Sequence, residues 1–394
     1  MKPAAALLLG VALVASSCGA GKPPPSAAGV APRAAEAFVT IAATLEAAST
    51  RRALALLPGG PQAQVLLDSV KWAAISPQVD VAILGAQGAV AYALPRDRGA
   101  FEKRLDDAGL LHARIRGWTA FTFNSQALDT AKRAKARLID AAWYAPAAQA
   151  AVGAKRSVLT HAGARWTAIV AEGGVVRRTT AGGGVDSRHR LATRIPANAV
   201  IAAAAHDFGA QLRALPYAPL VERGFGLRLD DVARATPGNA VLYLGAGVPI
   251  PTLTLIAEGG TLRAAALVVQ QLDPLAPAPV PVTIGGIRLN DVALGALDLY
   301  YGRTDGDLVL SNDSGLDLRP ASALEPPGLP AETTAWLYVD AERAPAALQS
   351  LAALAGTTFS PRLLRELRGL RSVLAYVTHT RRTTSVTVSV QPSG

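Results

Sequence analysis

The sequence predicts an α+β protein in which antiparallel sheets carry helices packed on one face, built from about two and a half repeated strand-helix-strand units. Apolar runs of strand length follow three prolines at nearly even intervals, and turn sequences join neighbouring alternating runs. Amphipathic segments of helical period lie between them. Half of the 394 residues are hydrophobic and 17% are charged, so the chain can bury large cores.

The N-terminus has the pattern of a bacterial export signal. The stretch "MKPAAALLLGVALVASSC" begins with the basic Lys2, continues as an apolar run and ends in small residues before Cys18. The run "LVASSC" resembles the lipobox of bacterial lipoproteins, which implies a signal peptide over 1–17, cleavage before Cys18 and diacylation of its thiol. Cleavage behind Ala20 is the alternative, and it would remove the cysteine with the signal.

Cys18 is the only cysteine, so a disulfide within one chain is impossible and lipidation is the use that fits its position. Residues 18–35, rich in proline, glycine and alanine, are expected to form a tether between the lipid and the folded body. By its resemblance to lipoproteins, the chain is expected to be exported and anchored in the envelope, facing the periplasm or the outer surface. The residue after Cys18 is Gly19 and not the aspartate that retains lipoproteins in the inner membrane of enteric bacteria, so the resemblance favours the outer membrane.

A similar stretch occurs three times. Pro58, Pro196 and Pro330 are each followed by a short polar turn and an apolar run that ends on a polar residue, at Asp68, His206 and Asp340 respectively. Apolar helices and second strands such as "VLAYVTHT", "AVLYLGAG" and "DVAILGAQ" follow. This spacing predicts one α+β unit over 36–195 and a second over 196–394, with a partial third repeat from about 328. Chance similarity in an alanine-rich chain is the alternative.

Hairpins and helices fill out the prediction. Asp305-Gly306 lies between two alternating runs and predicts a hairpin, and the two "AEGG" strings suggest others. The segment "RDRGAFEKRLDDAGL" predicts a helix that ends near Gly109, with Phe101 buried. The segment "NSQALDTAKRAKARLIDAAW" predicts a helix capped at Asn124 or Ser125. Its expected core side chains are Leu128, Leu138, Ile139 and Trp143. Other large core side chains are expected at Trp118, Trp166 and Trp336.

The recurring "LPA-acidic-T, strand, Asp" units resemble a bacterial envelope family catalogued as a domain of unknown function. The segments "AVAYALPRDRGAFEKRL" and "TAFTFNSQALDTAKRAKARL" carry the same resemblance. It implies tandem α+β units and an exported or membrane-anchored protein, and it implies no activity and no functional residues. At Pro58 the chain departs from the family pattern, because Gly-Gly-Pro follows it.

No catalytic constellation or metal site is predicted. The sequence has no G-x-S-x-G motif, and its five histidines are scattered singly, without a second ligand at helical or hairpin spacing. The stretch "LYLGAGVPIP" has G-x-G after a strand, but prolines replace the helix that would bind a pyrophosphate. No cofactor is therefore expected, and an enzyme would need a site that the sequence does not reveal.

The chain is basic, with 39 Lys and Arg against 29 Asp and Glu. In an envelope compartment this charge favours anionic lipid, lipopolysaccharide or cell-wall polymer as a partner over nucleic acid, besides the membrane reached by the N-terminal lipid. The segment "SPRLLRELRGLR" predicts an amphipathic helix whose cationic face could contact such surfaces, although a solvated face on a core-packed helix is the plainer interpretation. The candidate contact residues are Arg362, Arg365, Arg368 and Arg371.

Three classes of function follow from these observations. A scaffold or interaction module without catalysis explains the anchor and the missing catalytic residues. A carrier of lipid or another apolar ligand explains the small apolar residues of the strands, which could line a cavity. An enzyme with an unrecognised site is the third class.

Overall fold

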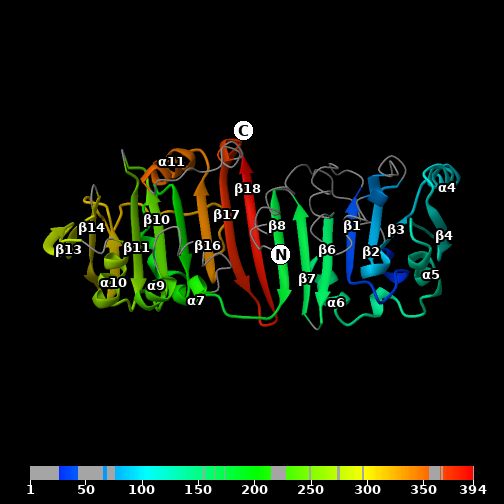
Figure 1. Cartoon of the computed structure of the whole chain (residues 1–394), viewed down its shortest axis with the longest axis horizontal. Coiled ribbons are helices and arrows are strands. Elements are labelled where there is room, and N and C mark those ends of the chain that lie inside the picture. Colours follow the sequence, from blue (N-terminus) through cyan, green and yellow to red (C-terminus); the bar gives the residue numbers. More distant parts are fainter. Residues whose placement is uncertain are drawn as a thin grey trace. The chain divides into compact units, whose positions relative to one another are not determined.

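A computed structural model describes residues 26–42, 65–68, 76–152, 154, 156–163, 165–172, 174–213, 228–247, 250–272, 276–294, 297–354, 364 and 367–393 (Figure 1). The chain divides into two compact units. Unit 1 comprises Met1–Gly184 with Thr380–Val388, and unit 2 comprises Val185–His379 with Ser389–Gly394. The division falls after Gly184, whereas the sequence places it before Pro196.

Unit 1 is built on an antiparallel sheet. Its strands are β1 (Ala37–Ala42), β2 (Gln78–Ile83), β3 (Ala89–Ala93), β4 (Leu111–Ile115), β5 (Trp118–Thr122), β6 (Arg156–Ala162), β7 (Arg165–Glu172) and β8 (Val175–Ala181). They lie in the order β4-β5-β3-β2-β1-β6-β7-β8, and β8 also pairs with β18 (Thr383–Pro392). The first strand of the unit therefore lies inside the sheet.

Both faces of this sheet are covered, because successive side chains on a strand point to opposite faces. On β2, Val79 and Val81 pack in a core with Phe101 and Leu105 of α4 (Arg98–Asp107). On the other face, Ala82 shares a core with side chains of α5 (Ser125–Arg133) and α6 (Tyr144–Ala150). The prediction that helices pack on one face is therefore wrong for unit 1, because its strands carry apolar residues at nearly every position.

The N-terminal segment, Ser26–Glu36, is part of the unit 1 core. It begins with the short 3₁₀ helix η1 (Ala27–Gly29), and the side chains of Ala27, Ala31 and Ala35 have no exposed surface. Small side chains let this backbone approach the sheet closely. The predicted tether over 18–35 is thus wrong from Ser26 onwards, and its first part lies outside the described residues.

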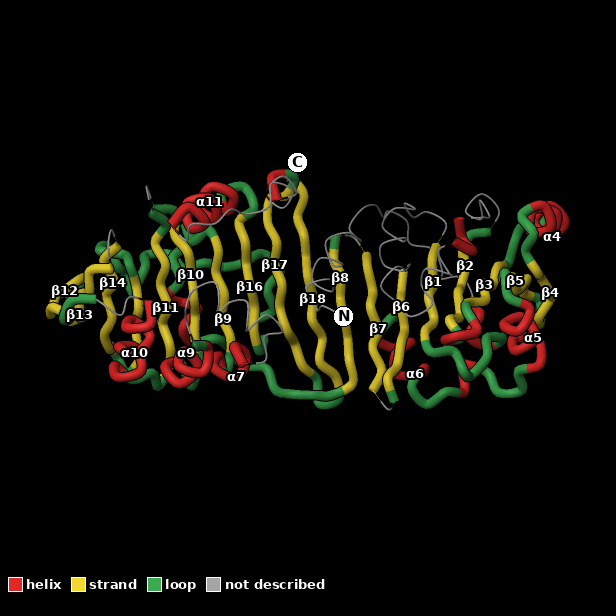
Figure 2. Tube along the Cα trace, in the orientation of Figure 1, coloured by secondary structure: helices red, strands yellow, loops and turns green. Residues whose placement is uncertain are grey.

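Unit 2 is likewise built on antiparallel strands (Figure 2). Its strands are β9 (Ile201–Ala205), β10 (Ala240–Gly245), β11 (Thr252–Glu258), β12 (Val280–Ile284), β13 (Ile287–Leu294), β14 (Leu297–Thr304), β15 (Asp307–Ser311), β16 (Ala335–Asp340) and β17 (Leu370–His379). Their order is β12-β13-β14-β15-β11-β10-β9-β16-β17. An α+β class with antiparallel sheets is confirmed by both units.

The two faces of the unit 2 sheet are covered by different kinds of element. One face packs with α9 (Leu229–Ala235) and α10 (Leu262–Leu272) around Leu308, and α11 (Ala344–Leu354) packs on Leu244 at the opposite end of the strands (Figure 1). The other face packs with the 3₁₀ helix η5 (Arg190–Arg194) and irregular segments around Trp336. The short helix α7 (Phe208–Arg213) follows β9.

Several local predictions are confirmed. Asp305 and Gly306 have φ of 51° and 86° and join β14 to β15, as a tight hairpin turn requires. The string "AEGG" also joins β7 to β8. The helix over 98–107 ends before Gly109, whose φ is 68°, and "APAALQSLAAL" forms α11. The expected tryptophans are 4% to 9% exposed, at Trp118, Trp143, Trp166 and Trp336.

Other local predictions are wrong. After β11, the second "AEGG" leads into α10 instead of a hairpin, because a helical apolar run follows it. The predicted long helix after Asn124 stops at Arg133, so Ile139 lies in a separate turn and is 55% exposed. Val65–Asp68, expected to end the first repeated strand, is helical.

The repeat that begins at Pro58, Pro196 and Pro330 is not confirmed. The strands after Pro196 and Pro330 are β9 and β16, which are antiparallel neighbours within one unit. A different correspondence exists between the units. In each, the first strand is internal, the next two run outward from it, a later strand (β5 or β15) pairs with the third, and the chain returns to the free side of the first strand (β6 or β16).

Candidate functional site

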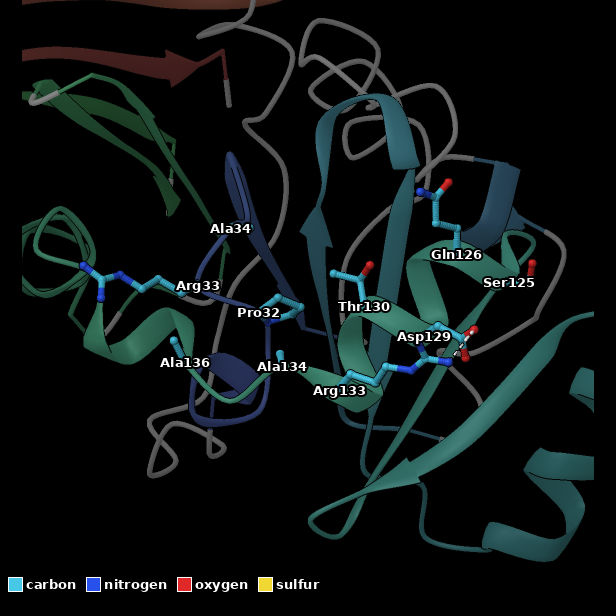
Figure 3. A pocket seen from close by; sticks show the side chains of 10 residues that line it. All are labelled: Pro32, Arg33, Ala34, Ser125, Gln126, Asp129, Thr130, Arg133, Ala134 and Ala136. Carbon is cyan, nitrogen blue, oxygen red and sulfur yellow. Dashed lines mark ion pairs between the residues drawn. The ribbon is translucent and has the colours of Figure 1, made fainter.

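Two grooves in unit 1 lie beside the N-terminal segment and share Arg33 and Ala34. The larger one has a volume of about 680 Å³ and lies between Pro32–Ala34, α5 and the residues after α5 (Figure 3). We call it the α5 groove. Its lining surface is more apolar than polar, and its polar side chains include Ser125, Asp129 and Arg133, which follow one another at the helical spacing of four residues that places them on one face.

The sequence around Asn124 builds this face. The Asn124 side chain accepts hydrogen bonds from the backbone N–H groups of Gln126 and Ala127 at 2.9 and 3.3 Å, which caps α5. Ala127, Leu128 and Ala131 then point into the core, so the opposite face of the helix is turned toward the groove.

Two arginines and one aspartate, Arg33, Arg133 and Asp129, carry the charges that line the α5 groove. Arg133 lies 3.8 Å from Asp129 in an ion pair, and Figure 3 shows its side chain reaching toward that carboxylate, whereas the Arg33 side chain extends away from Asp129. Arg133 is 83% exposed, so this pair is weak and the guanidinium can exchange one anionic partner for another. The groove can therefore receive an anionic or strongly polar ligand.

The second groove, which we call the Trp143 groove, has a volume of about 590 Å³. The Trp143 and His161 rings stack on each other in its wall, with centroids 4.6 Å apart, and Trp166 lies beside them. Glu36 and Arg33 supply opposite charges. Stacked rings and charged groups thus line the same groove.

A buried polar cluster holds the N-terminal segment between the grooves. The Asp80 carboxylate, with no exposed surface, accepts hydrogen bonds from the Ala27 backbone N–H at 2.6 Å and from Gln78 Nε2 at 2.8 Å. Burial raises the pKa of Asp80 to about 6, although these bonds and one from Thr40 oppose the rise. The walls of both grooves thus rest on a fixed backbone.

Arg137 fixes the same segment from the other side. Its guanidinium Nη1 donates to the Val30 carbonyl at 2.8 Å, and the backbone N–H of Leu138 donates to the Ala31 carbonyl at 2.9 Å. Nearby, burial raises the pKa of Tyr92, and the charge of Arg137 opposes that rise. Arg137 is 8% exposed, so its role is to hold structure and not to contact a ligand.

The residues that the sequence proposes for surface contact are only partly described. Cys18, Arg362 and Arg365 lie outside the described residues. Arg368 is helical and exposed, whereas Arg371 is exposed on β17. The prediction of one cationic helical face from 362 to 371 is therefore wrong at Arg371, because the β17 ladder with β16 includes residues from Ser372 onwards and takes Arg371 into an extended chain.

The sequence did not reveal that Arg33 and Arg133 line the same groove, because strands β1 to β5 lie between them in the chain. The available signal was the Asn124 cap, which sets the polar face of α5. Among the described residues, no group of three or more His, Cys, Asp or Glu side chains could hold a metal ion. In the same part of the chain, no helix has the length and hydropathy needed to cross a bilayer.

Comparison with known proteins adds little. No protein-family model matches the chain, and no curated protein matches it. A solved structure described as "Structure of crystal form III of TP0453" aligns with 75% of this chain and 97% of its own, at 10% sequence identity and a TM-score of 0.19. A likeness at this level carries no argument about fold or function.

Proposed function

We propose that this protein is a lipid-anchored component of a bacterial cell envelope and that it acts as an interaction module. In this proposal Cys18 is acylated, and unit 1 binds an anionic envelope lipid, lipopolysaccharide or cell-wall polymer through the α5 groove. The export pattern and the resemblance to an envelope family support the location. The carrying observation is the groove itself, which places exposed Arg133 beside the N-terminal segment that leads back to Cys18.

In this proposal only a short connection links the lipid to the core, and its length limits how far the α5 groove can lie from the membrane. Because the segment is built into the core from Ala27 onwards, only the stretch from Cys18 to Ser26 separates an acylated cysteine from unit 1. An extended chain of that length spans about 30 Å at most. The anchor would therefore keep the α5 groove within reach of a membrane surface, where anionic groups are concentrated.

A fatty-acid or lipid-tail carrier is less consistent with these grooves. Both are lined by charged side chains, and the α5 groove adds hydroxyl and amide groups from Ser125, Thr130 and Gln126. Desolvating such groups against an alkyl chain would cost free energy without a compensating hydrogen bond.

The anchor is tested by metabolic labelling with a radioactive fatty acid in a bacterial host that processes lipoproteins. We expect the full chain to take up label and to fractionate with membranes, and Cys18→Ala to lose both. Label retained by Cys18→Ala would contradict the anchor.

Binding is tested with the purified folded chain and vesicles of phosphatidylglycerol and phosphatidylethanolamine. Reversal of two charges, Arg33→Glu with Arg133→Glu, is expected to weaken binding at least about tenfold, because each arginine near an anionic surface contributes roughly 1 kcal/mol and a tenfold change requires about 1.4 kcal/mol. Arg368→Glu with Arg371→Glu makes the same change in net charge elsewhere and is the matched control. A loss seen only in the control pair would move the contact to those exposed arginines and contradict the groove.

A repetition of whole units takes the place of the repeat suggested by the sequence. We infer that units 1 and 2 derive from one ancestral unit, on the basis of their corresponding strand orders. Experimental structures in which β1–β3 with β5 and β6 fail to superpose on β9–β11 with β15 and β16 would contradict this inference.

A further inference from the structure

One end of the unit 2 sheet carries a row of polar residues. His206 directly follows β9, Asn239 directly precedes β10 and Glu258 ends β11. Figure 2 shows these three strands as neighbours. They are antiparallel, and Ala240 pairs with Ala205 on one side and with Ala257 on the other. The next position outward on each strand therefore places the three side chains side by side.

The hydrogen bonds along this row determine which atom of each side chain donates and which accepts. Asn239 Nδ2 donates to Glu258 Oε2 at 2.8 Å, and Glu258 Oε1 accepts from Arg190 Nε at 3.0 Å, which identifies Glu258 as an ionised acceptor. Because the Asn239 amide nitrogen faces the carboxylate, its Oδ1 faces His206. Asn239 Oδ1 lies 2.8 Å from His206 Nδ1, so Nδ1 carries the proton and donates.

The other ring nitrogen of His206 faces Ser187. With Nδ1 protonated in the neutral ring, Nε2 is an acceptor; Ser187 Oγ lies 2.8 Å from it, and the backbone carbonyl oxygen of Ser187 lies 3.1 Å from it. The hydroxyl of Ser187 therefore donates to His206. The Ser187 side chain is exposed, so a substrate can reach its oxygen. This is the arrangement of nucleophile, base and orienting group that activates a serine.

Two further contacts fix the base. His189 stacks on His206 with ring centroids 4.0 Å apart and planes 13° apart. Asp207, the residue after His206, has a φ of 49°, a left-handed conformation that turns the chain sharply into α7. The backbone N–H of His206 donates to the Thr334 carbonyl at 2.8 Å on the neighbouring strand. The ring is thus in contact with His189, Asn239 and Ser187, and the backbone that carries it is fixed by the bond to Thr334.

We propose that Ser187 is an acyl-transfer nucleophile, with His206 as its general base, Asn239 and Glu258 as positioning residues, and carboxylic esters as the class of substrate. Ser187 Oγ attacks the ester carbonyl while its proton passes to His206 Nε2. The bond from the acyl carbon to the alcohol oxygen breaks, and the alcohol leaves with that proton. Water, deprotonated by the same nitrogen, then releases the acid and restores Ser187. The site lies in unit 2 and requires neither the anchor nor the α5 groove.

The test uses the folded chain with a fluorophosphonate probe and with 4-nitrophenyl acetate. We expect one phosphonylated residue, Ser187, located by tandem mass spectrometry, together with turnover of the ester. His206→Gln should slow labelling at least about 100-fold, as loss of a general base does. Ser187→Ala should abolish both signals, whereas Ser322→Ala, at another exposed serine of unit 2, should change neither.

A second measurement does not depend on turnover. In Ser187→Cys, the histidine should favour the thiolate, so alkylation by iodoacetamide at pH 6, read at that position by mass spectrometry, should be at least about tenfold faster than in Ser322→Cys. Equal rates in these two variants, or phosphonylation of Ser187 that His206→Gln leaves unchanged, would overturn the proposal. Thermal unfolding of each variant shows that it is folded before it is compared.

Discussion

The backbone N–H of Ala27 donates a hydrogen bond of 2.6 Å to the carboxylate of Asp80, which has no exposed surface. This bond joins the first described turn of the chain to the second strand of unit 1. It satisfies a carboxylate inside an apolar core, where an unpaired charge would cost several kcal/mol. The N-terminal segment and the sheet are therefore coupled, and the coupling has a titratable group at its centre.

Asp80→Asn is expected to change how the stability of unit 1 depends on pH. The folded pKa of about 6 lies above the ordinary value of 3.8, so the stability linked to protonated Asp80 is complete below about pH 4 and is lost as the pH rises through 6. The asparagine does not titrate. From pH 4 to pH 8 the variant should gain up to about 3 kcal/mol relative to the wild type. Hydrogen exchange of β2 amides at both pH values measures this, and parallel pH profiles would contradict it.

Arg137→Ala is expected to release the N-terminal segment. Removal of Nη1 leaves the Val30 carbonyl buried without this donor, which costs about 1–3 kcal/mol, and it also empties space in the core. Hydrogen exchange and limited proteolysis should both rise around Val30. Arg133→Ala, at an exposed arginine of the same unit, is the control and should change neither. Unchanged protection around Val30 in Arg137→Ala would refute the role given to this guanidinium.

A fall in pH is expected to lower the stability of unit 2, because the unfolded chain takes up a proton at His189 more readily than the folded chain. Burial, followed by the charge of His206, lowers the pKa of His189 from 6.5 to about 4, while a hydrogen bond from the ring to the Thr333 backbone and the charge of Asp186 oppose the shift. The unfolded chain takes up a proton below about pH 6.5 and the folded chain does not. Stability is thus complete above pH 6.5 and declines toward pH 4.

His189→Gln should flatten this decline, because glutamine does not titrate. The stability of the two proteins is compared by urea unfolding at pH 7.5 and pH 4.5, with hydrogen exchange of the β9 and β10 amides as the readout. His112→Gln, at a histidine in unit 1 that contacts Asp106, is the control for general effects of acid. If His189→Gln is as sensitive to acid as the wild type, His189 is not the cause.

Gly209→Ala is expected to destabilise the packing of α7 against α9. A Cβ at this position would lie 2.6 Å from the Ala233 carbonyl oxygen and 3.0 Å from that of Thr236, both of which are backbone atoms. Such overpacking costs about 1–3 kcal/mol. Gly315→Ala, where the nearest atom is 3.5 Å away, is the matched control in the same unit. The two variants are compared by thermal unfolding, and equal midpoints would show that the helices adjust without cost.

The local predictions succeeded because each depends on only a few residues that are close in sequence. A hairpin at Asp305-Gly306 needs only two residues that tolerate positive φ between alternating runs, and the cap at Asn124 needs one side chain near two N–H groups. The predicted repeat is not confirmed, because apolar strands after a proline look alike in an alanine-rich chain. Which strand pairs with which depends on contacts that are remote in sequence, as between β9 and β16.

By itself, the sequence determined the α+β class with antiparallel strands, most strand positions and the ends of several helices, because period, turn residues and caps act within about one turn of chain. Only the tertiary structure decided that both faces of the unit 1 sheet are covered, that Ser26–Glu36 belongs to a core, and that Ser187, His206, Asn239 and Glu258 meet. Those four residues come from three strand ends and a loop, and only the register of an antiparallel sheet brings such ends into one row.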